Sequence, residues 1–299
     1  MRPFFFAVIG VVAFLVHGCS LYHPVGNVEY NVRTSISVVE GKRITMLMCG
    51  SCHFNPDTKQ FTGKKLEDSP AVFGTVYASN ITRDSTHGIG SYTDAQLAYL
   101  IRTGVSKSGK IMPYMQRPNI ADEDLQAIIA FLKSDDESVR PSTRSAGKTS
   151  YTTVGKLAVS TVKPLQYKNT TVSKPQEKGV LLGRYLVDNL ACFHCHSKSF
   201  VKLNMLEPEK SKGFMGGGNK LKDGEGKTVR IPNLTPHDTG IKNWTLYDFK
   251  KAITEGVSKD GSFITYPMPL FPELTHDEIT SMYAYIQTLK PIDNAIRND

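Results

Sequence analysis

Two five-residue segments of the chain combine thiols and imidazoles at a fixed spacing. Residues 49–53 read Cys-Gly-Ser-Cys-His, and residues 192–196 read Cys-Phe-His-Cys-His. Cys-x-x-Cys-His is the attachment sequence of c-type haem, in which two thiols add to the vinyl groups of one porphyrin and the imidazole binds its iron. The sequence therefore predicts two covalent haem c groups, with thioether bonds to Cys49, Cys52, Cys192 and Cys195 and iron ligation by His53 and His196.

Three other chemistries of the same residue types explain the pattern less well. Exported cysteines often form disulfides, but a histidine after both pairs would then be a coincidence. A structural zinc ion takes four Cys or His ligands, whereas each segment offers three, plus His194 in the second. A thioredoxin-like redox pair needs no trailing histidine. Haem attachment accounts for both segments.

The second axial position of each iron is expected to be filled by methionine, which raises the reduction potential. Met268 stands between two prolines, and these stiffen the loop that would present its sulfur. The first half offers both Met112 and Met115. The spacing from Gly104 to Met115 is close to the spacing from Gly256 to Met268, so we favour Met115. Met112, which is followed by proline, stays open as the alternative.

A repeat of domain size relates the two halves of the chain. Asn-Ile-Thr at residues 80–82 recurs as Asn-Leu-Thr at 233–235, and Gly-Val-Ser-Lys-x-Gly at 104–109 recurs at 256–261. Such a period indicates duplication of a whole fold. The two Asn-x-Thr sequences also match a glycosylation pattern, but their equivalent positions favour a local structural role. Tyr92 and Trp244 are equivalent too; they either pack in a core or donate a hydrogen bond to a haem propionate.

Each half is predicted to contain two main helices. One runs from Thr93 or Thr245 to the glycine at 104 or 256, and a terminal helix follows, with apolar residues at i, i+3, i+4 and i+7 over 125–132 and 279–286. Thr275 and Glu278 form a capping box for the second terminal helix. The matching position in the first half is Ala121, so we expect a poorer cap there, with Asp122 as its candidate residue.

The region between the repeats is polar, contains three prolines and lacks helical periodicity. Within it, residues 152–162 are rich in β-branched side chains and predict an extended strand across the domains. Residues 22–39 are expected to wrap the first domain. The predicted division is a signal peptide of lipoprotein type (1–18), an N-terminal extended segment (19–39), a first helical domain (40–134), a linker (135–178) and a second helical domain (179–299).

The leader predicts export. The apolar run from Phe4 to Val16 is too short for a helix that spans a membrane, and it has the length of a signal-peptide core. It is followed closely by Gly18-Cys19, which resembles a bacterial lipobox and predicts lipidation of Cys19; an uncleaved anchor with an incidental cysteine is the alternative. We expect the periplasm or the outer side of a bacterial membrane. The net charge is +8, but the sequence contains no block of basic residues interleaved with aromatic residues, so nucleic acid is not an expected partner.

In these motifs the chain resembles the di-haem c-type cytochromes related to the cytochrome c subunits of bacterial membrane-bound alcohol and aldehyde dehydrogenases. The shared features are Cys-x-x-Cys-His, Asn-Ile-Thr, Gly-Ile-Gly-x-aromatic-Thr, Gly-Val-x-x-x-Gly and a methionine before an acidic C-terminal helix, over roughly residues 40–134 and 180–290. The resemblance implies a mainly α protein with two tandem cytochrome c-like domains joined by an extended linker. It also implies His/Met ligation by His53 with Met115 and by His196 with Met268.

This resemblance favours electron transfer over catalysis. The expected donor is a dehydrogenase or quinol-oxidising complex, and the expected acceptor is a terminal oxidase or another cytochrome. The alternative is a di-haem enzyme of the peroxidase or thiosulfate dehydrogenase type, in which one iron is open or carries a labile ligand. Membership in a dehydrogenase complex stays open, because such subunits often carry three haems and this chain predicts two.

Overall fold

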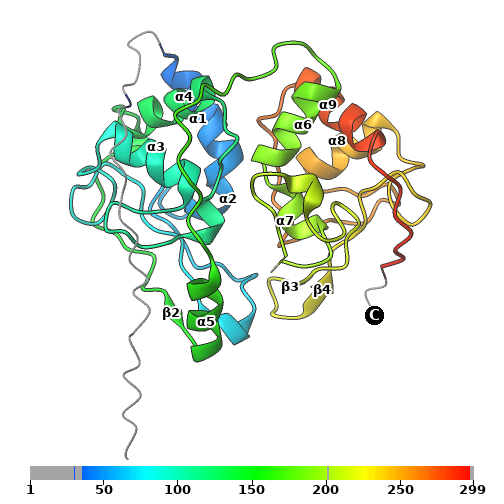
Figure 1. The fold of residues 1–299 in the computed structure, drawn as a ribbon, viewed down its shortest axis with the longest axis horizontal. Coiled ribbons are helices and arrows are strands. Elements are labelled where there is room, and N and C mark those ends of the chain that lie inside the picture. The colour runs from blue at the N-terminus through cyan, green and yellow to red at the C-terminus, as the bar shows by residue number, and fades with distance from the viewer. Residues whose placement is uncertain (1–29, 31–35, 201, 297–299) are drawn as a thin grey trace, which may run out of the picture.

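The computed structural model describes residue 30 and residues 36–200 and 202–296. The predicted signal peptide, Cys19 and most of the N-terminal extended segment lie outside this range. The prediction of a mainly helical chain is confirmed (Figure 1). In the described residues, no helix is both long and apolar enough to span a membrane.

The α-helices are separated by short turns and two small sheets. They are α1 (Val38–Thr45), α2 (Ser51–His53), α3 (Asp94–Thr103), α4 (Asp122–Leu132), α5 (Thr153–Thr161), α6 (Val180–Asn189), α7 (Cys192–His196), α8 (Leu246–Glu255) and α9 (His276–Gln287). A π-helical turn spans Met46–Gly50, and 3₁₀ turns span Ala71–Phe73, Pro113–Met115, Glu137–Val139 and Pro208–Lys210. Strand β1 (Gly74–Thr75) pairs antiparallel with β2 (Ser150–Tyr151), and β3 (Lys220–Lys222) pairs antiparallel with β4 (Thr228–Arg230).

Two buried apolar clusters organise the helices. In the first, α1 packs on α4; in the second, α6 packs on α9. Both helix pairs cross at a glycine. A Cβ atom at Gly41 would lie 2.0 Å from the backbone oxygen of Ala127, and one at Gly183 would lie 1.9 Å from that of Ser281. The close approach of the two backbones therefore requires glycine at both crossings.

Most of the predicted helix ends are confirmed. Thr93, Thr245 and Thr275 each form a capping box with the residue three positions later. Helices α3 and α8 end at Gly104 and Gly256, whose φ angles of 77° and 71° are readily adopted only by glycine.

The poorer cap expected for α4 is confirmed, but Asp122 as its capping residue is wrong. Ala121 itself occupies the N-cap position without a side-chain hydrogen bond, and Asp122 is the first helical residue. The carboxylate of Asp122 pairs with Arg102 instead of capping. The hydroxyl of Tyr185, from the other half, accepts a hydrogen bond from the backbone N–H of Ala121 at 3.2 Å. A tertiary contact thus takes the place of the missing capping side chain.

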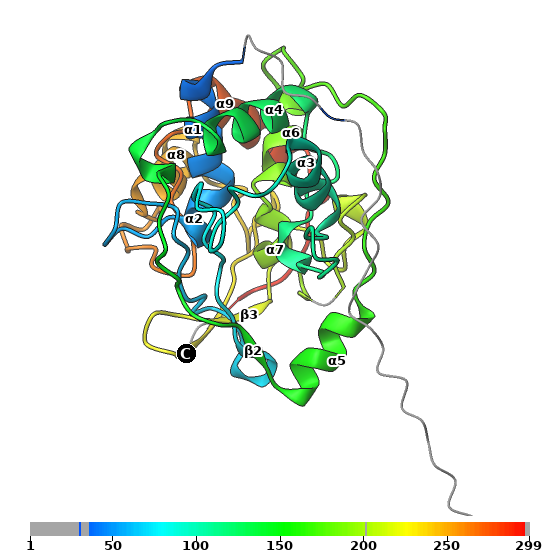
Figure 2. The same cartoon turned by 90° about the vertical axis from the view of Figure 1, so that its left-hand side faces the viewer.

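The expected strand at residues 152–162 is also wrong, because these residues form helix α5. Thr152 caps the helix by accepting a hydrogen bond from Gly155 N–H. Gly155 packs against Phe73, and a Cβ at this glycine would lie 2.1 Å from the Phe73 oxygen. The apolar side chains of Val154 and Leu157 are exposed to solvent. A good cap and one close contact outweigh the β preference of the sequence (Figure 2, where α5 lies apart from the helices of both clusters).

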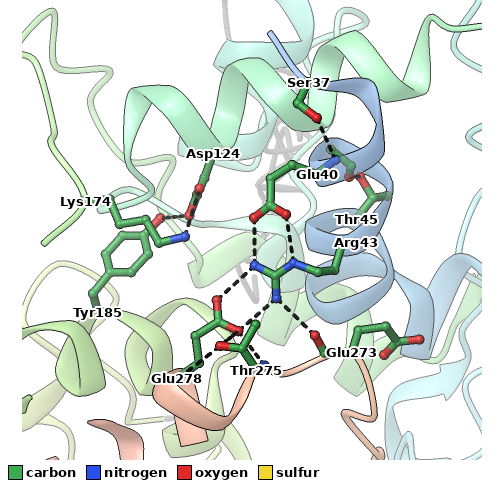
Figure 3. Close-up of polar contacts among 11 residues, drawn as sticks. Ser37, Glu40, Arg43, Thr45, Asp124, Lys174, Tyr185, Glu273, Thr275 and Glu278 are labelled. Atoms are coloured by element: carbon green, nitrogen blue, oxygen red, sulfur yellow. Dashed lines mark hydrogen bonds and ion pairs between the residues drawn. The ribbon is translucent and has the colours of Figure 1, made fainter. Parts of the chain in front are cut away.

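The two halves are joined by two equivalent contacts (Figure 3). Arg43 of α1 donates hydrogen bonds of 2.8 and 2.9 Å to both carboxylate oxygens of Glu278, the third residue of α9. Tyr185 of α6 donates a hydrogen bond of 2.6 Å to the carboxylate of Asp124, the third residue of α4. Arg43 and Tyr185 each lie two residues after the crossing glycine of their helix. In each half, the residue two positions after the crossing glycine therefore contacts the N-terminus of the other half's terminal helix.

Candidate haem attachment sites

Both Cys-x-x-Cys-His segments lie on helical backbone. The first runs from the π-helical turn into α2, and the second is α7. The four described cysteines form no disulfide. Burial raises the pKa of Cys49, Cys192 and Cys195 to about 12, so these thiols are protonated at neutral pH. Each pair of thiols is therefore available for covalent attachment in this structure.

The histidines of the two segments are held in the same way. Both are buried, with 7% of His53 and 6% of His196 exposed. Nδ1 of His53 donates to the carbonyl oxygen of Ser79 at 2.7 Å, and Nδ1 of His196 donates to that of Pro232 at 2.9 Å. Burial lowers the pKa of both imidazoles, that of His196 to about 4. Each neutral ring therefore keeps the lone pair of Nε2 for a metal, with its tautomer fixed by a second contact.

The repeated Asn-x-Thr sequences hold the carbonyls that orient these rings. Asn80 follows Ser79 directly, and its amide nitrogen donates to the carbonyls of Ser142 and Arg144 at 2.7 and 2.9 Å. Asn233 follows Pro232, and its amide donates to the carbonyl of Ile292 at 2.7 Å. Both asparagine oxygens accept a hydrogen bond from the backbone N–H two residues later. The local structural role predicted for both asparagines agrees with these contacts.

Hydrogen bonds of the methionine loops define equivalent positions in the two halves. The backbone N–H of Met112 donates to Gly104 O, and that of Ile264 donates to Gly256 O, so Met112 corresponds to Ile264. The backbone N–H groups of Met115 and Met268 each donate to the carbonyl three residues earlier. Met115, and not Met112, therefore occupies the turn position of Met268, with one residue fewer in the first loop.

The chain contacts between the halves bring the two segments into one region. Leu47 and Met48, which precede the first segment, pack into the second apolar cluster. The rings of Tyr114 and Phe200 lie 5.4 Å apart, and Phe200 also contacts the ring of His194. Nε2 of His194 is buried without a hydrogen-bond partner. The sequence did not predict this junction, because its residues come from four separate segments.

Arg117 is the site residue that sequence reasoning missed. It lies two residues after Met115, and its guanidinium donates to the carbonyl of Asn189, three residues before Cys192, at 3.0 Å. Its equivalence to Phe271 in the second half follows from the backbone hydrogen bonds of the two loops, which the sequence alone does not show.

The residues fit the group that the sequence predicts. Each half supplies two unpaired thiols one helical turn apart, a neutral imidazole with a free Nε2 and a methionine on a short turn. These are the donors of a covalently bound haem with His/Met ligation. Within the described residues, no cluster of three or more His, Cys, Asp or Glu side chains is arranged for another metal ion.

Comparison with known proteins agrees with this donor set. Residues 38–135 match the family model for cytochrome c. The matched region contains α1, the first attachment segment, the Met115 loop and α4.

The chain as a whole is similar to cytochrome subunits of dehydrogenases. It is 28% identical over 217 residues to the fructose dehydrogenase cytochrome subunit of Gluconobacter japonicus. This match covers 70% of this chain and 42% of the relative. It is 25% identical over 256 residues to the gluconate 2-dehydrogenase cytochrome c subunit of Pantoea cypripedii, and this match covers 81% of this chain and 56% of the relative. A diheme cytochrome c of Cereibacter sphaeroides is 27% identical over 224 residues, and this match covers 71% of this chain and 70% of the relative. The chain thus spans about half the length of the two dehydrogenase subunits.

Proposed function

We propose that this protein is a di-haem c-type cytochrome that transfers electrons between other proteins. The observation that carries the proposal is the equivalent construction of two Cys-x-x-Cys-His sites, each with a buried imidazole oriented through Nδ1 by the carbonyl that precedes an Asn-x-Thr turn. The proposal includes the division into domains at 40–134 and 179–299, joined by the linker at 135–178. Similarity to dehydrogenase cytochrome subunits and to a diheme cytochrome supports it.

In this proposal each half holds one haem. Cys49 and Cys52 bind the first haem covalently, and His53 and Met115 ligate its iron. Cys192 and Cys195 bind the second haem, and His196 and Met268 ligate its iron. A bound haem supplies one-electron exchange between ferric and ferrous iron. The chain holds the ligands in place, so that an electron is gained or lost with little movement of atoms.

The hydrogen bonds of the loops support Met115 over Met112 as the first sulfur ligand. The backbone hydrogen bond of Met112 is equivalent to that of Ile264, a residue that cannot ligate iron. Met115, in contrast, occupies the turn position of Met268. Two methionine ligands would leave neither iron with an open position, which favours electron transfer over the peroxidase or thiosulfate dehydrogenase alternative.

We also propose that the protein works outside the cytoplasmic membrane, attached through a lipid on Cys19. Haem attachment to Cys-x-x-Cys-His and the apolar leader both favour export. The proposed donor is a dehydrogenase or quinol-oxidising complex, and the proposed acceptor is a terminal oxidase or another cytochrome. The names of the relatives support a dehydrogenase as the donor. Metabolic labelling with a radioactive fatty acid tests the anchor, and Cys19→Ser is the control that should remove the label.

The haem content of three proteins tests the central proposal. The unaltered chain, the double variant C49A/C52A and the double variant C192A/C195A are produced in a host that attaches haem c. After extraction of non-covalent haem, we expect two haems per chain in the unaltered protein and one in each variant. A colourless chain, or a single haem that persists in both variants, would contradict the proposal.

A redox titration monitored by absorption spectra tests electron transfer itself. We expect two reversible one-electron steps and low-spin spectra at both irons. Carbon monoxide should bind neither ferrous haem readily. Rapid carbon monoxide binding together with turnover of peroxide or thiosulfate would replace electron transfer by the enzymatic alternative.

A further inference from the structure

One face of helix α3 is covered in the first half, whereas the equivalent face of α8 is exposed in the second. Both helices contain ten residues between a capping threonine and a left-handed glycine, so residue 102 corresponds to residue 254. Arg102 is 4% exposed and Thr103 is fully buried. Their equivalents are Thr254, which is half-buried, and Glu255, which is exposed. Two equivalent helices therefore differ in what lies over them.

The linker covers this face in the first half. In Figure 1 the green chain between α5 and α6 runs along the first half before it crosses to the second. The ring of Tyr167 stacks on that of Tyr99 with 5.7 Å between the centroids, and the guanidinium carbon of Arg102 also lies 5.7 Å from the Tyr167 centroid. Further along the linker, the carbonyl of Val172 accepts a hydrogen bond of 2.8 Å from the backbone N–H of Asp122, the first residue of α4. A segment without helix or strand, with one tyrosine packed on α3, thus closes this surface.

The same surface of the second half forms an open groove. A hollow of about 350 Å³ lies beside α8 and the start of α9, and its lining includes the buried side chains of Leu274 and Ile279. Thr254 and His276 also line it, and His276, the first residue of α9, corresponds to Asp122. Among the described residues, no acceptor is found for the backbone N–H of His276. The place that the linker takes in the first half is therefore open here.

The contrast continues toward the loop of Met268. A Cβ atom at Gly104 would meet the side chain of Gln116, and one at Gly256 would meet that of Leu270, so Gln116 and Leu270 occupy equivalent positions. Gln116 is 3% exposed and donates a hydrogen bond to the linker carbonyl of Lys163 at 3.4 Å. Leu270 is 46% exposed. An apolar side chain thus faces solvent where the first half has a polar side chain bonded to the linker.

Two aromatic side chains add to the exposed surface of the second half. Ile111 and Phe263 form equivalent bridges with Val105 and Val257, yet Ile111 is 2% exposed and Phe263 is 82% exposed. Tyr247 of α8 is also exposed. Contiguous apolar surface on a soluble protein marks an interaction site more often than single exposed residues do.

The chemistry of the groove suits an aromatic side chain. Leu274 and Ile279 supply apolar contacts, and Lys250 brings an ammonium group to the same lining. A cation over an aromatic face is a favourable contact, as the first half shows with its arginine and the linker tyrosine. Leu270 lies two residues after Met268, so an occupant that reaches Leu270 also lies close to this loop.

We propose that the groove binds an extended segment of a redox partner protein, which packs an aromatic side chain on α8 as the linker packs Tyr167 on α3. A backbone carbonyl of the segment accepts the hydrogen bond of His276 N–H, as Val172 does for Asp122. Bound in this way, the partner lies next to the Met268 loop and hence next to the second proposed haem. That the partner exchanges electrons rests on the proposed function, whereas the fit of the segment does not.

N-acetyl-tyrosinamide is the probe for the groove. It is titrated into the reduced holoprotein, labelled with ¹³C in the methyl groups of leucine and isoleucine. The signals of Leu274 and Ile279 should shift saturably, while those of Ile120 and Leu125, their equivalents in the first half, should stay in place. Thr254→Trp fills the groove and should remove the shifts, whereas Thr254→Ser leaves it open and should keep them.

Photo-cross-linking in the producing host tests the partner. A photo-reactive phenylalanine analogue at position 270 should form a cross-link to a redox protein, at a segment that contains an aromatic residue. The same analogue at position 99 is the matched control and should cross-link to the chain's own linker near Tyr167. Thr254→Trp should lower the yield from position 270 about tenfold, because a blocked anchor pocket removes a large share of the binding energy.

Three results would overturn the inference. One is a folded holoprotein in which Leu274 and Ile279 do not respond to the probe. The second is a Thr254→Trp variant with unchanged shifts and cross-linking yield. The third is a cross-link from position 270 only to lipid or to a second copy of this chain, or none at all. The haem count keeps the two proposals apart: fewer than two haems contradicts the proposed function, while the response of the groove signals decides the fit of the segment.

Discussion

The two halves share what orients the histidines and differ in what surrounds the proposed haems. Both have a helix pair that crosses at glycine, an imidazole bonded to a carbonyl and an asparagine that holds the following turn. They differ in the length of the loop before Met115 and Met268 and in the side chain that follows each sulfur, which is Arg117 in the first half and Phe271 in the second. This difference teaches that two halves built alike can keep the geometry of a site while the residues around it diverge.

The halves also differ in how the first helix reaches the cysteines. Cys49 lies eight residues after Gly41, and α1 continues through a π-helical turn into the segment. Cys192 lies nine residues after Gly183; here α6 ends, and Ala191 takes a left-handed φ of 60° before α7 begins. One extra residue thus converts a continuous helix into a broken one. The π turn and the left-handed alanine are therefore two different backbone routes into an attachment segment.

The largest expected difference concerns the proposed sulfur ligands. Met268→Ala and Met115→Ala should each lower one potential by about 0.2 V, within the range of about 0.8 V that axial ligands set. Met112→Ala is the matched control and should leave both potentials close to those of the unaltered protein. A redox titration with spectra of both haems provides the measurement. A large shift in the Met112 variant, with none in the Met115 variant, would reverse the proposed ligand.

The helix crossings should respond alike in the two halves. Gly41→Ala and Gly183→Ala each place a Cβ at about 2 Å from a backbone oxygen of the facing helix. We expect each substitution to lower the free energy of unfolding by about 3 kcal/mol, at the upper end for overpacked sites. Gly224→Ala, with open space around it, is the control. Thermal denaturation of the three variants provides the comparison, and an unaffected Gly183 variant would show that the halves are packed differently.

The contact between Arg43 and Glu278 should weaken in acid. Burial opposes ionisation of Glu278, but hydrogen bonds from Arg43 and Thr275 hold its pKa below the ordinary value. A carboxylate with a lowered folded pKa stabilises the protein above its unfolded pKa of about 4.3, and this stabilisation is lost as the pH falls through the folded value.

Arg43→Met should therefore cost about 2 kcal/mol near pH 7, because it leaves the carboxylate of Glu278 without its main partner, and less below pH 4. Tyr185→Phe removes the equivalent contact to Asp124 and serves as the comparison. Denaturant unfolding at several pH values measures both. An Arg43 variant whose deficit is the same at pH 3 and pH 7 would rule out the ion pair as the cause.

The smallest expected effect concerns the broken helix of the second half. Ala191→Gly should stabilise the protein by about 1 kcal/mol, because glycine adopts a left-handed φ without the steric cost of a Cβ atom. Gly50→Ala, in the continuous first helix with no contact closer than 3.5 Å, should not destabilise the protein. Thermal denaturation of both variants tests this pair, and a loss of stability on Ala191→Gly would show that the left-handed conformation is not strained.

Local signals predicted most of the helix ends. Thr93, Thr245 and Thr275 cap helices as expected, because a capping box depends on residues three positions apart. The strand expected at 152–162 failed for the opposite reason. Its helix is capped locally by Thr152, but it also packs Gly155 against Phe73, and residues so distant in the chain leave no mark on local propensity. Ala121 is similar, since the group that binds its backbone N–H is the hydroxyl of Tyr185.

The sequence by itself determined the proposed chemistry of this protein. The spacing of two thiols and an imidazole is a local property, and its recurrence in the second half of the chain predicted two equivalent sites. Only the tertiary structure decided how these sites differ and how the halves meet. Arg117 gained its significance when folding placed it between the Met115 loop and Asn189, and Arg43 gained its significance when folding placed it beside Glu278. Charge and hydrogen bonding act through space, so their partners are fixed by packing and not by position along the chain.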